Sequence, residues 1–342
     1  MTQKIKFAVI GQGHIGKRHA EMIRRNSEAE LVAVCDIVPK EKLGLNEITE
    51  TFYTSPALML AAHPEVEVVS ICTPNGLHAE HSLTALESGK NIICEKPMAL
   101  TKADCETIIF KALQMQKNVF CVMQNRYSPP SVWLKNIIEN KNIGDIFMVQ
   151  LNCYWNRDER YYKKNGWKGS QNLDGGTLFT QFSHFIDIMY WLFGDIKDIQ
   201  ARFKDFTHSG LTEFEDSGLV NFNFMNGGMG CINYSTAVWD NNLESSITII
   251  GSKGSVKVGG QYMDKVEYCH IKDYTMPELA PTNAANDYGA YKGSANNHNY
   301  IFKNVIDTLK GRNTITTNAM EGLKVVEIIE RIYSLRKENR KS

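Results

Sequence analysis

A glycine-rich segment near the N-terminus has the spacing of a dinucleotide-binding turn. Residues 11–16 read G-Q-G-H-I-G, which is the pattern G-x-G-x-x-G, and they follow an apolar strand-like run. In such a turn the first glycine makes the bend, the second admits a pyrophosphate, and the third allows close packing of helix on strand. The amides at the helix start would receive the phosphates. The residues predicted to bind the cofactor here are Gly11, Gly13, His14, Ile15 and Gly16.

Asp36 predicts which nicotinamide dinucleotide is bound. It follows Gly16 by twenty residues, at the end of the second predicted strand. A carboxylate at this place accepts hydrogen bonds from the adenosine ribose and repels a 2′-phosphate, so we expect NAD rather than NADP. Lys40 and Lys42 lie just beyond and offer the alternative of pairing with that phosphate, although solvated loop lysines are the simpler interpretation.

Polar residues at the ends of two later strands extend this predicted site, because ligands of a doubly wound sheet bind outside the carboxyl ends of its strands. Thr73 and Asn75 lie in T-P-N, where turn formation explains them equally well. His78 opens the next helix, where a structural role competes with cofactor contact. Glu95 and Lys96 lie in C-E-K-P after another strand. The lysine could transfer a proton or bind a hydroxyl oxygen beside the nicotinamide.

The order of these motifs resembles that of the glucose–fructose oxidoreductase, inositol dehydrogenase and MocA (Gfo/Idh/MocA) family over essentially the whole chain. Residues 175–187, G-G-T-L-F-T-Q-F-S-H-F-I-D, look like the family's G-G-x-L-x-D-x-G-x-H-x-x-D helix. The resemblance implies that Lys96 and His184 form a catalytic pair beside the nicotinamide. Thr180 stands where the family has an aspartate that would orient the histidine. Lys96 could therefore carry more of the proton transfer.

The spacing within this segment also predicts a polar cavity. Thr177, Thr180, Gln181 and His184 fall at i, i+3, i+4 and i+7, which places them on one face of a continuous helix over residues 176–193. Their neighbours are mostly apolar, so this polar stripe is expected to face a substrate. A satisfied core histidine is the alternative for His184.

Several further segments carry a second resemblance. They are Q-N-R-Y (124–127), Y-W-N-R (154–157), R-Y-Y (160–162), G-W-K-G (166–169), Y-K-G-S (291–294) and N-H-N (297–299), together with Thr180-Gln181. In combination they resemble a subgroup of that family, the UDP-N-acetylglucosaminuronate 3-dehydrogenases of surface-polysaccharide (O-antigen) biosynthesis. The resemblance implies NAD-dependent oxidation of a secondary sugar hydroxyl, at C3, in a UDP-linked N-acetylhexosaminuronic acid. Cationic side chains, with Arg160 and Lys168 among them, could bind a carboxylate or diphosphate, and aromatic faces could stack on a sugar or base. A subunit interface would use the same residue types. The residues expected to contact substrate are Gln124, Arg126, Tyr127, Arg157, Trp167, Thr180, Gln181, His184 and His298.

The hydrophobic pattern predicts the elements that position these groups. In residues 1–124 short apolar runs alternate with amphipathic stretches, which indicates a Rossmann domain with a doubly wound parallel sheet. In residues 125–342 long extended segments with N-G-G and G-S-K-G turns indicate an α+β domain with an open, mostly antiparallel sheet. This second domain is expected to bind substrate, and the free face of its sheet predicts a homodimer or homotetramer.

Composition limits the class of protein. Among 342 residues, 38 Lys+Arg balance 38 Asp+Glu, which argues against a nucleic-acid or membrane-surface partner. No apolar run approaches the roughly 18 residues of a spanning helix, and no leader peptide is evident. The eight cysteines form no C-x-x-C pair, and the nine histidines form no H-x-x-x-H helix pair with an acidic partner. We therefore expect a cytoplasmic protein with reduced thiols and without a metal.

Two other classes of function stay open. One is an inositol or simple-sugar dehydrogenase, or an NAD-dependent glycosidase, on the same scaffold. The other is a non-catalytic NAD sensor, against which the presence of both Lys96 and His184 argues.

Overall fold

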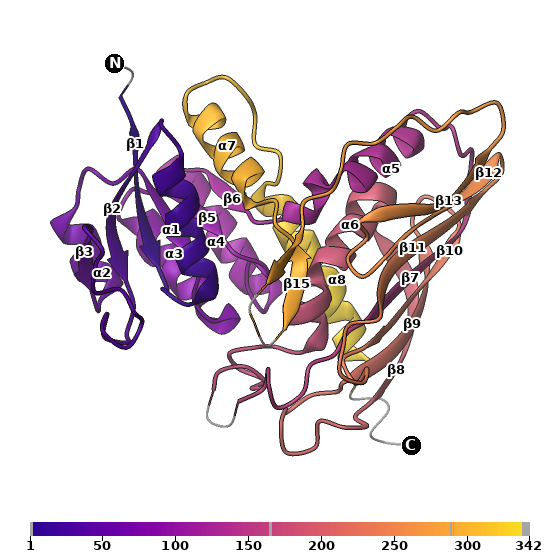
Figure 1. The fold of residues 1–342 in the computed structure, drawn as a ribbon, viewed down its shortest axis with the longest axis horizontal. Helices are drawn as coiled ribbons and strands as arrows, with labels where there is room; N and C mark the ends of the chain where they lie inside the picture. The colour runs from indigo at the N-terminus through magenta and orange to yellow at the C-terminus, as the bar shows by residue number, and fades with distance from the viewer. Residues whose placement is uncertain (1–2, 164–165, 288, 290, 337–342) are drawn as a thin grey trace. The chain divides into compact units, whose positions relative to one another are not determined.

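The computed structural model describes residues 3–163, 166–287, 289 and 291–336, and divides the chain into two compact units. The first unit comprises Met1–Met123 and His298–Val326, and the second comprises Gln124–Asn297 and Glu327–Ser342. Figure 1 shows the elements of each unit. No helix in the described ranges is both long and apolar enough to cross a membrane. All eight cysteines are free thiols.

The return of residues 298–326 to the first unit differs from the single boundary expected at residue 124. Helix α7 (His298–Leu309) packs there, with its Phe302 ring 5.1 Å from the ring of His19. Beyond α7, Lys310 and Arg312 form ion pairs with Glu28 at 2.6 and 2.7 Å. These partners are nearly 300 residues away in the sequence, so local patterns in the C-terminal segment could not reveal them.

The first unit has a six-stranded parallel sheet in the order β3-β2-β1-β4-β5-β6, which confirms the predicted Rossmann fold. The order reverses between β1 and β4, the switch point at which such sheets bind ligands. The sequence missed β3, which has only three residues and little burial. The strands are β1 (Ile5–Ile10), β2 (Ala29–Cys35), β3 (Thr51–Tyr53), β4 (Val68–Ile71), β5 (Asn91–Cys94) and β6 (Val119–Cys121).

Helices cover this sheet and place their apolar faces on it. In α1 the buried residues Gly16, His19, Ala20 and Ile23 follow the i, i+3, i+4, i+7 spacing of one helical face. The stripe therefore sets which way His19 points, toward the sheet. The helices are α1 (His14–Arg25), α2 (Pro56–Ala62), α3 (His78–Glu87), α4 (Lys102–Met115), α7 and the first half of α8 (Ala319–Ser334).

The second unit has a seven-stranded sheet in the order β13-β12-β11-β7-β10-β9-β8, antiparallel except for the β7–β10 pair. This confirms the predicted open sheet, although the sequence missed β13 and the small β14–β15 hairpin. Its helices are α5 (Pro129–Glu139), α6 (Ser183–Phe193) and the end of α8. The strands are β7 (Ile146–Tyr154), β8 (Ile196–Lys204), β9 (Ser217–Phe224), β10 (Met229–Ser235), β11 (Glu244–Gly251), β12 (Gly254–Gly259), β13 (Lys265–Ile271), β14 (Ala285–Asp287) and β15 (Lys292–Ala295).

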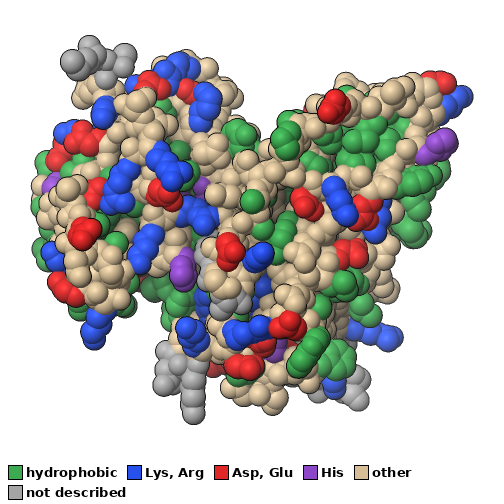
Figure 2. All heavy atoms as spheres, in the orientation of Figure 1, with side chains coloured by type: hydrophobic (Ala, Val, Ile, Leu, Met, Phe, Trp, Pro, Cys, Tyr) green, Lys and Arg blue, Asp and Glu red, His purple; other side chains and the backbone are tan. Residues whose placement is uncertain are grey.

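One face of this sheet is buried and the other is open. Along β9 the residues alternate between buried and exposed, as expected for a half-covered antiparallel strand. Met148 is paired with both Met229 and Ile250 on the adjacent strands, so the three share the open face, and all three are exposed. Figure 2 shows exposed hydrophobic side chains on the surface of this unit. The open face therefore carries an apolar row across three strands.

Candidate active site

The glycine-rich turn between β1 and α1 has the geometry that its spacing predicts. Gly11 has a φ of +90°, and a Cβ on Gly16 would lie 1.7 Å from the carbonyl oxygen of Gly11. A Cβ on Gly13, in contrast, would meet nothing within 4 Å. Gly13 precedes α1 without a side-chain cap, and the first helical turn has no acidic residue. The open space and the helix start therefore fit a phosphate group.

Asp36 presents a fixed carboxylate beside this turn. Its two oxygens accept hydrogen bonds from the backbone amides of Gln12 at 2.6 Å and Val38 at 2.8 Å. The side chain is half-buried at the carboxyl end of β2. The remaining lone pairs can accept from ribose hydroxyls, so the residue fits the adenosine end of a dinucleotide.

Alanine substitutions at the two glycines should separate folding from cofactor binding. Gly16→Ala forces a Cβ into the Gly11 carbonyl, and we expect the free energy of unfolding to fall by about 1–3 kcal/mol. A Cβ at Gly13 would meet no atom within 4 Å, and the φ of Gly13 is −68°. The melting temperature of NAD-free Gly13→Ala should therefore equal that of the wild type. Its NAD dissociation constant should rise at least about tenfold, a loss of ~1.4 kcal/mol. Thermal unfolding and NAD titration measure both; wild-type NAD affinity in Gly13→Ala would contradict the assignment.

The turn after β4 holds Thr73, Asn75 and His78, of which the structure gives His78 a structural role. Its Nδ1 lies 2.7 Å from the carbonyl oxygen of Pro97, and its Nε2 lies 2.8 Å from that of Thr73. Burial lowers the pKa of His78, although its carbonyl partners oppose this shift. Thr73 is hydrogen-bonded to His81 at 3.0 Å, and Asn75 is buried in a 3-10 turn. His78 thus ties the T-P-N turn to the C-E-K-P turn, while cofactor contact by these residues stays a prediction.

The C-E-K-P turn places a buried carboxylate next to a half-buried lysine. Lys96 follows β5, and its peptide bond to Pro97 is cis. Glu95 points inward, where its Oε1 lies 2.9 Å from Nε2 of His19 and 3.5 Å from Nε2 of His298. Sequence reasoning missed His19 altogether and grouped His298 with the substrate contacts. The structure instead buries His298 within the first unit, so its assignment to substrate stays a prediction that this position does not favour.

The predicted continuous helix over residues 176–193 is interrupted in the second unit. Residues Leu178–Phe182 form a wide π-helical turn before α6 begins at Ser183. The wide turn splits the predicted polar stripe, because Thr177 donates to the Glu215 carbonyl while Thr180 donates to Asp174. Such turns are frequent at functional sites.

Asp174 places a buried carboxylate beside Thr180. It is fully buried, its Oδ1 accepts a hydrogen bond from the Thr180 hydroxyl, and its Oδ2 accepts one from the Gly169 amide at 2.7 Å. Sequence reasoning overlooked Asp174, although it directly precedes Gly175-Gly176 in the motif. The Thr180 hydroxyl is therefore hydrogen-bonded to a carboxylate, and Thr180 lies four positions before the buried His184.

Arg157 lies buried in a cage of aromatic rings with no carboxylate partner within ion-pair distance in the described chain. Its guanidinium carbon is 4.7 Å from the ring centroid of Trp155, 5.1 Å from that of Tyr161 and 5.3 Å from that of Tyr291. Its Nε donates to the side-chain oxygen of Gln181 at 2.7 Å, and its other bonds go to neutral acceptors. Burial lowers the pKa of Arg157. The structure thus brings together two residues, Arg157 and Gln181, whose contact with substrate stays a prediction.

Some of the remaining residues predicted to contact substrate already have hydrogen-bond or ion-pair partners within the protein, and others do not. Arg126 forms a buried two-pronged ion pair with Asp187 of α6, at 2.9 and 2.5 Å, so the structure gives it an internal anion instead. Gln124 and Tyr127 share its 3-10 turn, and the buried Oε1 of Gln124 lacks a hydrogen bond within the described residues. Trp167 is half-buried. Their contact with substrate stays a prediction.

Two further cations of the aromatic loop also have partners. Lys168 lies 3.8 Å from the ring centroid of Tyr161 and 3.0 Å from the Tyr291 hydroxyl, so it joins the cage around Arg157. Arg160, in contrast, is exposed and paired with Asp158 and Asp240. Arg157 and Lys168 are therefore the two cations that face the same aromatic rings.

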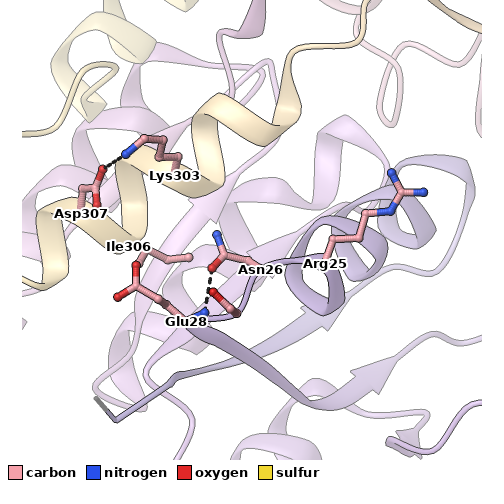
Figure 3. A pocket seen from close by; sticks show the side chains of 7 residues that line it. Arg25, Asn26, Glu28, Lys303, Ile306 and Asp307 are labelled. Atoms are coloured by element: carbon pink, nitrogen blue, oxygen red, sulfur yellow. Dashed lines mark hydrogen bonds and ion pairs between the residues drawn. The ribbon is translucent and has the colours of Figure 1, made fainter. Parts of the chain in front are cut away.

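A separate polar hollow of about 320 Å³ lies on the first unit, shown in Figure 3. It adjoins the end of α1 and the loop that leads into β2, at the amino ends of the strands. Ligands of parallel sheets bind at the opposite, carboxyl ends. Its acidic residues Glu28 and Asp307 are already paired with lysine and arginine. Nothing therefore connects this hollow with the cofactor. It is lined by Arg25, Asn26, Ser27, Glu28, Lys303, Ile306 and Asp307.

Comparison with known proteins gives consistent matches for both units. Residues 5–123 match the profile of an oxidoreductase family with an NAD-binding Rossmann fold (GFO_IDH_MocA), and residues 135–342 match the C-terminal alpha/beta domain of that family. The chain is similar to the WlbA dehydrogenase of Chromobacterium violaceum, crystallised with NADH and UDP-GlcNAcA. Identity is 31%, the TM-score is 0.86, and 99% of this chain and 96% of that chain are covered.

Two other relatives show the range of this similarity. The Bordetella pertussis WlbA dehydrogenase, also solved with NADH and UDP-GlcNAcA, is 28% identical with a TM-score of 0.83 over 98% of both chains. The inositol 2-dehydrogenase of Salmonella typhimurium is 31% identical over 221 residues, which are 63% of this chain. That alignment spans 62% of the Salmonella protein.

Proposed function

The chain belongs to the Gfo/Idh/MocA oxidoreductase family, which has an NAD-binding Rossmann domain, and on this premise we propose its substrate and chemistry. It oxidises a secondary hydroxyl, at C3, of a UDP-linked N-acetylhexosaminuronic acid in the cytoplasm. The observation that carries this proposal is the buried Arg157 without a carboxylate partner in the described chain.

An anionic substrate explains why such a cation is kept. A buried charge without a counter-charge is costly, and an ionised ligand beside it recovers part of that cost. Arg157 holds the oxygen of the Gln181 amide, whose buried nitrogen makes no hydrogen bond in the described chain. A sugar carboxylate or hydroxyl can accept from this amide nitrogen. The relatives crystallised with UDP-GlcNAcA support the same class of ligand.

The residues of the chain supply positioning and proton transfer. NAD, when bound, accepts the hydride of the carbinol carbon. Lys96 and His184 are proposed to hold the hydroxyl oxygen and take its proton, as the family resemblance implies. The carboxylate of Asp174, through its hydrogen bond from Thr180, is proposed to hold in place the wide turn that precedes His184.

A substrate panel tests the proposal. Purified protein is mixed with NAD and, in parallel, with UDP-N-acetylglucosaminuronate, UDP-N-acetylglucosamine, myo-inositol and glucose, and NADH is followed by absorbance. We expect the acidic UDP-sugar to give the largest kcat/KM. A larger value for myo-inositol would instead establish the second candidate, an inositol dehydrogenase, which the 31% identity to the Salmonella enzyme favours. Bound cofactor that no sugar reduces would indicate a sensor.

Removing the buried cation should lower selectivity for the acid. Arg157→Met keeps apolar bulk in the aromatic cage but deletes the charge. We expect kcat/KM for UDP-N-acetylglucosaminuronate to fall about 10- to 100-fold, as for loss of a charged hydrogen bond of roughly 1.5–3 kcal/mol, with a smaller fall for UDP-N-acetylglucosamine. The matched control is Arg202→Met on β8, an exposed arginine of the same unit. Equal losses of kcat/KM for both sugars would show that Arg157 does not recognise the substrate carboxylate.

The apolar row on the open sheet face supports a homodimer or homotetramer. Met148, Met229 and Ile250 are adjacent across three strands and exposed, and apolar patches of this kind mark association surfaces. Met148→Glu would place a charge in the middle of the row and is expected to lower the oligomeric state in light scattering. Gln114→Glu, an exposed glutamine on α4 of the first unit, is the control. An unchanged mass for Met148→Glu would place the interface elsewhere.

A further inference from the structure

Three buried side chains meet behind the C-E-K-P turn of the first unit. His19 comes from α1, Glu95 follows β5, and His298 is the first residue of α7. Their exposed fractions are 0%, 7% and 1%. The two imidazole rings pack edge to face with centroids 5.6 Å apart. The cluster therefore joins three distant segments at the residue that precedes Lys96.

The hydrogen-bond partners define the charge of this cluster. Ser70 Oγ lies 2.5 Å from Nδ1 of His19 and can donate to it, which leaves the Nε2–H of His19 to donate to Glu95 at 2.9 Å. Neither ring nitrogen of His298 makes a hydrogen bond within the described chain, but its Nε2 lies 3.5 Å from Oε1 of Glu95, within ion-pair distance. Burial opposes ionisation of Glu95, but the two imidazoles outweigh it and hold the pKa of Glu95 well below its usual range. Burial lowers the pKa of His298, so a neutral ring faces an ionised carboxylate.

The second oxygen of the carboxylate faces the backbone of the lysine. Oε2 of Glu95 accepts a hydrogen bond from the amide of Lys96 at 3.2 Å. One carboxylate thus links two helices to the peptide unit of Lys96. A Glu95 side chain that is held at Oε1 has little freedom to turn Oε2 away from that amide.

We propose that His19 and His298 are positioning residues, which orient the Glu95 carboxylate and thereby hold the Lys96 peptide at the end of β5. The inference rests on the proposed catalytic role of Lys96. It differs from that role because neither histidine touches the reacting groups in this account. It also replaces the predicted substrate contact of His298.

A metal ion is the alternative that this ligand set suggests. Two imidazoles and one carboxylate can bind zinc, with the three ligand atoms in this cluster within 4.8 Å of one another. Tetrahedral zinc, with bonds of about 2.0–2.2 Å, keeps its ligand atoms roughly 3.3–3.5 Å apart. The 2.9 Å between His19 Nε2 and Glu95 Oε1 is shorter and is an ordinary hydrogen-bond length. A shared proton therefore accounts for this contact better than a metal.

The test compares variants that keep or remove hydrogen bonding. His298→Leu removes the ring nitrogen that faces Glu95 at similar volume, His298→Gln keeps a nitrogen that can face it, and Glu95→Gln removes the charge. With UDP-N-acetylglucosaminuronate and NAD, we expect kcat to fall about 10- to 100-fold in His298→Leu and Glu95→Gln, as for a misplaced catalytic group. KM and the NAD dissociation constant should stay within about twofold, and His298→Gln should recover most of kcat. His63→Ala, which breaks the histidine–carboxylate pair with Glu65 at the amino ends of the strands, is the matched control.

A double variant shows whether the cluster acts through the lysine. Glu95→Gln combined with Lys96→Ala should be no slower than Lys96→Ala alone, because a residue that acts through another adds nothing once that residue is absent. Amide hydrogen exchange at Lys96, which needs no substrate, should be faster in Glu95→Gln and His298→Leu. Elemental analysis of the purified protein should find no stoichiometric zinc.

The outcomes separate this inference from the proposed function. Full turnover in Glu95→Gln and His298→Leu, with turnover lost in Lys96→Ala, would overturn the positioning role and leave the function standing. Full turnover in Lys96→Ala would overturn both. Multiplicative losses in the double variant, unchanged exchange at Lys96, or one bound zinc per chain would each overturn the inference alone.

Discussion

Lys96→Ala is expected to lower kcat by about three orders of magnitude, within the 10²–10⁴-fold range of a positioned proton-transfer group. Lys96 follows β5 at the carboxyl end of the sheet, where ligands of this fold bind, and its backbone is held by Glu95. The phosphate-binding turn lies in a different loop, so the NAD dissociation constant should change less than about twofold. Turnover and NAD titration measure the two effects separately.

The control for this result is Lys102→Ala, six residues later, where the lysine is exposed and paired with Glu106 within α4. Its kcat should equal that of the wild type. A small primary amine in the assay is expected to restore part of the lost rate in Lys96→Ala, because it supplies the missing nitrogen. Near-normal turnover in Lys96→Ala would remove this residue from the chemistry.

His184→Asn should lower kcat by about 10²- to 10³-fold, again with little effect on NAD binding. The side chain is buried in the first turn of α6, after the wide turn that carries Thr180 and Gln181. Asp174→Asn should cause a smaller loss of kcat. One of the two carboxylate oxygens, which accept from the Thr180 hydroxyl and from the Gly169 amide, becomes an NH2 group that cannot accept.

A matched pair of variants isolates the histidine. Ser183→Ala, at the preceding residue of the same helix, should retain wild-type turnover. If His184→Asn keeps full turnover while Lys96→Ala does not, the lysine alone transfers the proton. In that case the threonine at position 180, where the family has an aspartate, would go with a mechanism in which His184 transfers no proton.

The sequence predicts those parts of the fold that local patterns encode. The parallel strands of the first unit are apolar runs separated by amphipathic stretches, and the Gly11–Gly16 turn is defined by steric contacts within one βα connection. Short or weakly buried elements, such as β3 and β13, have no such pattern and were missed. The wide turn at Leu178–Phe182 has an apolar pattern that fits an ordinary helix equally well.

The parts of the site that escaped prediction depend on partners far away in the sequence. Glu95 meets His19 and His298, which lie 76 residues before and 203 residues after it. Arg126 resembled a substrate ligand until the structure paired it with Asp187, 61 residues later. The spacing of residues within a motif cannot show whether an arginine forms an ion pair with a carboxylate of the same chain. Arg157 and Arg126 show this difference within a single unit.

The transfer of deuterium from a labelled substrate tests the central claim most directly. The protein is incubated with NAD and UDP-N-acetylglucosaminuronate that carries deuterium at C3, and the reduced cofactor is analysed by mass spectrometry. Oxidation at C3 predicts NADH that contains one deuterium atom and a sugar product that has lost it. Unlabelled NADH together with a sugar that retains its deuterium would place the reaction at another carbon, and no NADH at all would contradict the proposed substrate.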